Sequence, residues 1–152
     1  MDISCFMRTE LVFLDIDAQS KMDAFQHIVN GMVQNEIIDD PAAFLAEIVD
    51  RENQSSTCIG RGIALPHTRT VFLDQPIIAF ARARKHVNFS EKSTDSVRFI
   101  FLMGTPAGDP GTYLKILGNL CRRLRATGFR DSLETAVSAK EILGLFSDES
   151  VN

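Results

Sequence analysis

The sequence predicts an α/β (α+β) fold, in which a mixed β-sheet is covered by helices on both faces to give three α/β/α layers. One strand-like segment is followed by two helix-like segments, then several strand-like segments, then three helix-like segments, and this order is typical of a layered sheet. In addition, Val97–Met103 is apolar almost throughout, as in strands that are covered on both faces. The 152 residues suffice for one core, so a single domain is expected over residues 1–152.

The first half of the chain is expected to contain one strand and two helices. The apolar run Leu11–Leu14 predicts the strand. Ser20 is expected to cap a helix, because apolar residues then recur at the spacing of one helix face. Asp40 before Pro41 predicts the start of a second helix, since proline is favoured at the first helical position, and this helix is expected to end near Arg51.

The middle of the chain is expected to supply the rest of the sheet. Extended structure is expected around Ile63–Leu65, where apolar residues precede a proline. Ile77–Ala83 and Val97–Met103 read as longer strands, because both are apolar runs of strand length.

The last third of the chain is expected to be helical. Gly104–Gly111 is rich in glycine and proline and predicts a loop. A helix is expected over Thr112–Ala126, followed by a short helix around Asp131–Val137. Ser138 and Glu141 have the spacing of a capping box, which predicts the start of a final helix.

The composition argues against several classes of protein. The formal net charge of −4 does not favour a nucleic-acid partner. No apolar stretch approaches about 20 residues, so membrane insertion is not expected. Met1–Cys5 lacks the basic start and apolar run of a signal peptide, so a cytoplasmic location is expected. The three cysteines and three histidines show no metal-ligand spacing, so free thiols and no metal site are expected.

The segment Arg51–Arg69 carries the most specific chemistry. Pro66 fixes its own φ and holds Leu65 extended, so His67 follows a stiff support. The imidazole titrates near neutrality and can act as an unprotonated nucleophile. Side chains able to hold an oxyanion surround it in sequence, namely arginines 51, 61 and 69 and the hydroxyls of Ser56, Thr57 and Thr68.

The order Arg-Glu, Ser-Thr and Ile-Gly-x-Gly-Ile-Ala-Leu-Pro-His in this segment resembles the signature of the fructose/mannitol-type EIIA domain. That domain belongs to the bacterial phosphoenolpyruvate:sugar phosphotransferase system, and a free-standing chain of this size resembles its nitrogen-regulatory subclass. The layout resembles the family from about Leu11 to Phe146. The resemblance implies that His67 accepts a phosphoryl group and that Arg51 helps to hold it.

One departure from the family pattern concerns a later helix. Family members often open it with His-Leu-x-x-Leu-x-x-Leu, whereas Tyr113 stands in the histidine's place here. A phenol donates a hydrogen bond to a phosphate or to the His67 ring but cannot become a cation. Tyr113 is nevertheless expected to lie against His67 in the fold. A smaller departure is Cys58, where the family usually has glycine.

The remaining site residues divide into phosphate-binding and supporting groups. Thr57, Ser56 and Gly60 are expected to bind the phosphate, although Thr57 is open to a second interpretation, in which it only bonds its own turn. Glu52 and Pro66 are expected to give structural support. Arg51 is also a helix-end residue favoured by the macrodipole, which is compatible with phosphate binding. His67 itself is expected to be a partly exposed loop residue.

Two hypotheses of function follow. In the first, the chain is a protein-histidine phosphocarrier, an EIIA component of the phosphotransferase system that needs no cofactor. It takes a phosphoryl group from an HPr-like donor and passes it to an EIIB-type acceptor, or its phosphorylation state is read by a transporter, kinase or regulator. The alternative is a non-catalytic regulatory binding module on the same scaffold, with Tyr113 marking the loss of transfer.

Overall fold

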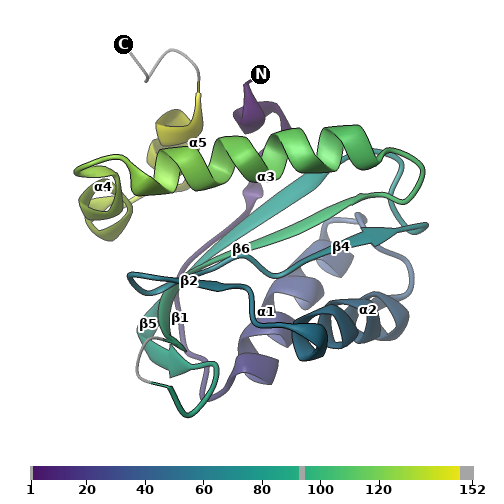
Figure 1. Ribbon diagram of the computed structural model, residues 1–152, viewed down its shortest axis with the longest axis horizontal. Helices are drawn as coiled ribbons and strands as arrows, with labels where there is room; N and C mark the ends of the chain where they lie inside the picture. Colours follow the sequence, from purple (N-terminus) through teal and green to yellow (C-terminus); the bar gives the residue numbers. More distant parts are fainter. Residues whose placement is uncertain (1, 93–94, 148–152) are drawn as a thin grey trace.

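A computed structural model describes residues 2–92 and 95–147 and shows three layers (Figure 1). The elements along the chain are η1 (Ile3–Phe6), β1 (Met7–Ile16), α1 (Lys21–Gln34), α2 (Pro41–Gln54), β2 (Cys58–Gly60), β3 (Ile63–Ala64), β4 (His67–Thr70), β5 (Ile77–Asn88), β6 (Ser96–Pro106), α3 (Pro110–Arg125), α4 (Phe129–Thr135) and α5 (Ala139–Phe146). Helices α1 and α2 lie on one face of the sheet, and α3, α4 and α5 lie on the other. The predicted three-layer α/β/α arrangement is therefore confirmed.

The sheet is mixed, as predicted. Its strand order is β1-β5-β6-β3-β2, and β4 pairs with β6 as well. β1 runs parallel to β5, β5 and β6 are antiparallel, and both β3 and β4 are parallel to β6. Two short strands thus follow one another along the same edge of β6, separated only by Leu65 and Pro66. This arrangement fixes the backbone immediately before and after Pro66.

Each face of the sheet has its own hydrophobic core. On β6, Phe99 and Phe101 pack toward α3, α4 and α5, whereas Ile100 and Leu102 pack toward α1 and α2. Alternate residues of a strand point to opposite faces, so a strand covered on both sides is apolar at every position. This explains the continuous apolar run that predicted a buried strand.

The helix starts follow the predicted caps. Ser20 accepts a hydrogen bond from the backbone of Asp23, and Ser138 accepts one from Glu141. Several boundaries differ from the prediction. β1 extends beyond Leu11–Leu14 to Met7–Ile16, α2 continues past Arg51 to Gln54, and α4 spans Phe129–Thr135. β5 continues past Ala83 to Asn88, and the expected loop Gly104–Gly111 is shorter, because β6 runs to Pro106 and α3 begins at Pro110.

The start of α3 is set by its own sequence. The Asp109 carboxylate accepts a hydrogen bond from the Thr112 backbone at 3.2 Å, and Pro110 occupies the first turn. A capping aspartate and a proline at this position favour helix initiation. Tyr113 consequently lies in the first turn of α3.

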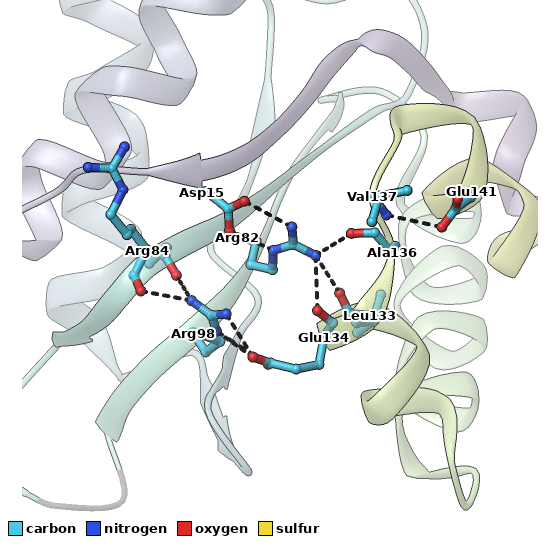
Figure 2. Close-up of polar contacts among 10 residues, drawn as sticks. Asp15, Arg82, Arg84, Arg98, Leu133, Glu134, Ala136, Val137 and Glu141 are labelled. Atoms are coloured by element: carbon cyan, nitrogen blue, oxygen red, sulfur yellow. Dashed lines mark hydrogen bonds and ion pairs between the residues drawn. The ribbon is translucent and has the colours of Figure 1, made fainter.

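A buried arginine joins α4 to the sheet (Figure 2). Arg82 on β5 is only 5% exposed, and its Nε donates to Asp15 at 2.9 Å. Its Nη1 donates to the backbone oxygen of Ala136 at 2.7 Å, just beyond the end of α4, where carbonyl groups lack helical partners. Nearby, Arg98 forms an ion pair with Glu134 at 2.7 Å. Together, these contacts tie α4 to β1, β5 and β6.

None of the helices in the described residues is both long enough and apolar enough to cross a membrane.

Candidate functional site

A cavity of about 810 Å³ opens between β4, the end of α2 and the start of α3. It brings together three residues that the sequence nominated, with His67 from β4, Arg51 from α2 and Tyr113 from α3. The remaining lining residues are Glu47, Asp50, Gln54, Thr68, Arg69, Ala107, Pro110 and Leu114. The site is thus assembled from segments that are distant in the sequence.

His67 is a buried strand residue, and its expected position in a partly exposed loop is wrong. It begins β4, is 6% exposed and pairs with Met103 of β6. The difference arises because the chain resumes pairing directly after the proline, where the Met103 N–H donates to the Pro66 oxygen at 2.9 Å. Pro66 thus contributes its carbonyl group to the support of His67.

The tautomer of His67 follows from one hydrogen bond. Its Nδ1 lies 2.6 Å from the backbone oxygen of Leu65. A carbonyl oxygen only accepts, so the neutral ring carries its hydrogen on Nδ1 and its free lone pair on Nε2. Nε2 is therefore the nucleophilic atom of this imidazole.

Burial lowers the pKa of His67 below its usual value of 6.5. The hydrogen bond to Leu65 opposes this shift, the positive charge of Arg51 lowers the pKa further, and the negative charge of Glu52 raises it. Desolvation is the largest of these effects. The ring is consequently neutral, and able to act as a nucleophile, at pH values near 7.

Tyr113 lies against His67, as predicted. Their ring centroids are 5.3 Å apart, with the ring planes inclined by 51°. Burial raises the pKa of the Tyr113 phenol, although the positive charges of Arg51 and Arg69 oppose this shift. The phenol therefore stays protonated and neutral at physiological pH, when it is a hydrogen-bond donor without charge.

Arg51 places a positive charge in the cavity. It lies in the last turn of α2, where a cation interacts favourably with the helix dipole. One guanidinium nitrogen, Nη1, donates to the backbone and hydroxyl oxygens of Ser55, each at 3.2 Å. Within residues 2–92 and 95–147, Arg51 forms no ion pair with a carboxylate. Its charge is therefore available to an anion in the cavity.

Glu52 and Thr57 form a buried pair beside the cavity. One oxygen of the Glu52 carboxylate accepts from the Thr57 backbone N–H at 3.1 Å, and the other accepts from the Thr57 hydroxyl at 2.7 Å. Glu52 is 6% exposed, so these bonds satisfy a carboxylate that is removed from water. The pair joins the end of α2 to the start of β2, which matches the supporting role expected of Glu52.

The sequence matches the family described as "Phosphoenolpyruvate-dependent sugar phosphotransferase system, EIIA 2" over residues 5–149. The chain belongs to this EIIA family. The resemblance carried by the segment before His67 is thereby confirmed.

Two curated relatives illustrate the range of EIIA proteins. The chain is 28% identical over 147 residues to the PTS system fructose-specific EIIA component of Haloferax volcanii, covering 97% of this chain and 96% of that protein. It is also 28% identical over 147 residues to the PTS system fructose-specific EIIABC component of Bacillus subtilis. That match covers 97% of this chain but only 23% of the Bacillus protein.

Solved EIIA structures have the same fold. The nitrogen regulatory protein IIA-Ntr from Neisseria meningitidis superposes with a TM-score of 0.88 at 28% identity, covering 95% of this chain and 99% of that one. IIA mannitol from Escherichia coli superposes with a TM-score of 0.76 at 22% identity, covering 92% and 98%. The same E. coli protein is also solved in complex with phosphorylated enzyme IIB mannitol (TM-score 0.76, 21% identity, 92% and 97% coverage). At these lower identities, the two mannitol structures show the fold alone.

The three residues of this EIIA chain that were expected to bind phosphate do not line the His67 cavity. The Thr57 hydroxyl donates a hydrogen bond to Glu52, and the exposed Ser56 hydroxyl accepts one from the backbone N–H of Cys58 at 3.2 Å. Gly60 has a positive φ of 86° and lines a separate cavity of about 330 Å³ between the β2–β3 turn and the end of α3. Because none of the three lines the cavity, their binding of a phosphate stays a prediction.

Arg69 was named among the arginines able to hold an oxyanion but not among the residues expected to form the site, although it lines the cavity. The signal was present, because residues i and i+2 of a strand share a face. A loop was expected here instead of β4, so the shared strand face of His67 and Arg69 was not predicted. The α2 residues Glu47, Asp50 and Gln54 were also missed, although their spacing places them on the same helix face as Arg51.

Proposed function

We propose that this EIIA chain is a phosphocarrier whose acceptor atom is Nε2 of His67. The donor is a phosphohistidine on an HPr-like protein. The acceptor is an EIIB-type protein, or else a transporter, kinase or regulator that reads the phosphorylation state. The observation that carries this proposal is the hydrogen bond from Nδ1 to Leu65, which leaves the Nε2 lone pair of a buried, neutral imidazole for the reaction.

The transfer step follows from this geometry. The Nε2 lone pair of His67 attacks the phosphorus atom of the donor phosphohistidine, and a new P–N bond forms as the donor's P–N bond breaks. The donor imidazole leaves with the electron pair. Catalysis of phosphoryl transfer is mostly positioning and charge stabilisation, so the protein needs a fixed nucleophile and a nearby cation. The support around Pro66 supplies the first, and Arg51 supplies the second.

The onward transfer is the same step in reverse. The family membership and the EIIB complex of the E. coli mannitol protein support a protein acceptor of EIIB type. The cavity is broad enough for this, because about 810 Å³ exceeds the volume of a single phosphoryl group. We propose that an acceptor side chain enters this space beside Arg51 and Tyr113.

The neutral phenol of Tyr113 favours a second candidate function. A site with one positive charge fewer stabilises a phosphoryl group less well, so the scaffold could serve as a regulatory binding module without fast transfer. In that case, the cavity face would dock to a partner whether or not His67 is phosphorylated.

The deciding experiment is intact-protein mass spectrometry. The chain is incubated with phosphoenolpyruvate, the general phosphotransferase enzyme and an HPr-like donor, in parallel with the variants His67→Ala and His86→Ala. We expect an acid-labile gain of one phosphate in the parent chain and in His86→Ala, with none in His67→Ala. The absence of labelling in the parent chain would favour the binding module. NMR of the labelled ring then reports whether Nε2 or Nδ1 carries the group.

A further inference from the structure

Arg69 lines the cavity but has no role in the transfer step proposed for His67. It lies two residues after His67 on β4, so the two side chains share one face of the strand, and both line the cavity. Its guanidinium carbon lies 5.9 Å from the centroid of the Tyr113 ring, in cation–π range. The ring of Tyr113 in turn lies 5.3 Å from that of His67. Tyr113 thus lies against both Arg69 and His67 at the cavity.

The charge of Arg69 has no carboxylate partner among the described residues. The side chain is exposed, and it forms no ion pair with Glu47 or Asp50, the two acids that line the same cavity. An arginine held over an aromatic ring keeps its five N–H donors in its own plane, free to meet an anion at the edge. Its fork geometry suits phosphate oxygens.

We infer that Arg69 is a second phosphoryl-binding residue of this site, and that Tyr113 acts as the platform that positions it. A phosphoryl group on His67 Nε2 extends from the ring into the cavity, between Arg51 on the α2 side and Arg69 on the β4 side. Each guanidinium then donates hydrogen bonds to the phosphoryl oxygens. This inference rests on the proposed acceptor role of His67 and adds the residue that supplies the second cation.

The two arginines are expected to act differently before phosphorylation. The charge of Arg51 lowers the pKa of the bare His67 ring and of the Tyr113 phenol, whereas the charge of Arg69 lowers that of Tyr113 and is not among the causes of the His67 shift. Arg69 is therefore placed to meet the phosphoryl oxygens and has little effect on the imidazole itself. This difference separates a phosphoryl-binding role for Arg69 from a general effect of positive charge near the histidine.

The test uses the full chain and the variants Arg69→Gln, Arg69→Lys and Arg84→Gln. Arg84 is a matched control, because it is an exposed arginine on β5 outside the cavity, and its replacement removes the same charge. His67 is phosphorylated chemically with phosphoramidate, so that the docking of a donor protein does not enter the measurement. ³¹P NMR then follows the titration of the phosphoryl group, and ¹H NMR follows the titration of the unphosphorylated ring.

Loss of a neighbouring cation raises the pKa of an anion. We therefore expect Arg69→Gln to raise the pKa of the phosphoryl group while leaving the pKa of unphosphorylated His67 unchanged. Arg69→Lys should restore part of the difference, and Arg84→Gln should match the parent chain. In equilibrium exchange with an HPr-like donor, Arg69→Gln should lower the phosphorylated fraction, with the exchange constant reduced about threefold to tenfold.

The role of Tyr113 as a platform is tested by a double-mutant cycle. In a Tyr113→Leu background, Arg69→Gln should have a much smaller effect on the exchange constant, because the arginine is no longer held in place. Full additivity would overturn the platform role. An Arg69→Gln phosphoryl titration that matches that of Arg84→Gln would overturn the phosphoryl-binding role, provided that the parent chain is labelled. Failure of the parent chain to accept phosphate at all would instead overturn the proposed function.

Discussion

The imidazole of His67 and the phenol of Tyr113 lie against each other at the cavity, with 5.3 Å between their ring centroids and 51° between their ring planes. One ring is carried by a strand, and the other by the first turn of a helix on the opposite side of the cavity. The proposed nucleophile therefore lies beside a hydrogen-bond donor that carries no charge. The consequences for phosphoryl transfer, stability and pH dependence can each be measured.

His67→Ala should abolish labelling. The buried position of the ring also changes the expected effect on stability, since the variant loses the hydrogen bond to Leu65 and leaves a small cavity. We expect the free energy of unfolding to fall by about 1–2 kcal/mol, measured by urea denaturation. Labelling of this variant at the parental level would show that another residue accepts the phosphate.

Arg51→Lys should keep the charge but lose the planar fork that binds two phosphoryl oxygens together. We expect slower labelling by the donor protein and faster hydrolysis of phospho-His67, by about tenfold for each rate. Quenched-flow labelling and the decay of the ³¹P signal measure the two rates. If both rates equal those of the parent chain, Arg51 serves only as a helix-end residue.

Tyr113→Phe removes the phenolic hydroxyl and keeps the ring that contacts His67 and Arg69. A hydrogen bond to a charged group contributes about 1.5–3 kcal/mol, so we expect transfer to slow by about tenfold or more. Tyr113→His should instead speed transfer, because an imidazole can become a cation in the same place. Equal rates in all three proteins would show that this position does not contact the phosphoryl group.

Acidification should destabilise the folded chain through His67. Burial lowers the pKa of this ring below 6.5, so between that value and the folded-state pKa the unfolded chain binds more protons. The contribution of the neutral ring to the free energy of unfolding is complete above pH 6.5. It is lost as the pH falls from 6.5 through the folded-state pKa. The difference in unfolding free energy between the parent chain and His67→Gln should therefore shrink between about pH 7.5 and about pH 5. A constant difference would contradict a lowered pKa.

Glu52→Gln replaces a buried carboxylate that accepts two hydrogen bonds from Thr57. The amide retains one acceptor and turns a donor toward the threonine, so we expect a loss of about 1–3 kcal/mol in unfolding free energy. The negative charge of Glu52 also raises the pKa of His67, so the variant should lower that pKa further in an NMR titration. Asp50→Asn, an exposed position on the same helix, is the matched control for stability.

The sequence predicted the layers of this fold because its local signals agree with one another. The caps at Ser20 and Ser138 and the apolar run on β6 each depend on residues that are close together in the chain. His67 and Arg51 were nominated by local chemistry as well as by the family resemblance, whereas Tyr113 was nominated by the resemblance alone, and the three meet at the cavity.

The features that the sequence did not predict depend on long-range contacts. The burial of His67 results from pairing between β4 and β6, and Gly60, which pairs with Ile63 at the β2–β3 turn, lines a separate cavity. Likewise, the hydroxyl of Thr57 is occupied by Glu52, a buried carboxylate whose partner could not be identified from spacing alone. Local sequence signals do not specify these contacts.

The backbone around the proposed acceptor is anchored on both sides, because Ala64 pairs with Ile100 before Pro66 and His67 pairs with Met103 after it. Such a segment has little freedom to move when a phosphoryl group adds about −1.5 to −2 charges. We therefore expect the two forms of the protein to share one shape and to differ in surface potential. A partner that distinguishes them must sense an electric field, and its discrimination should weaken as ionic strength rises.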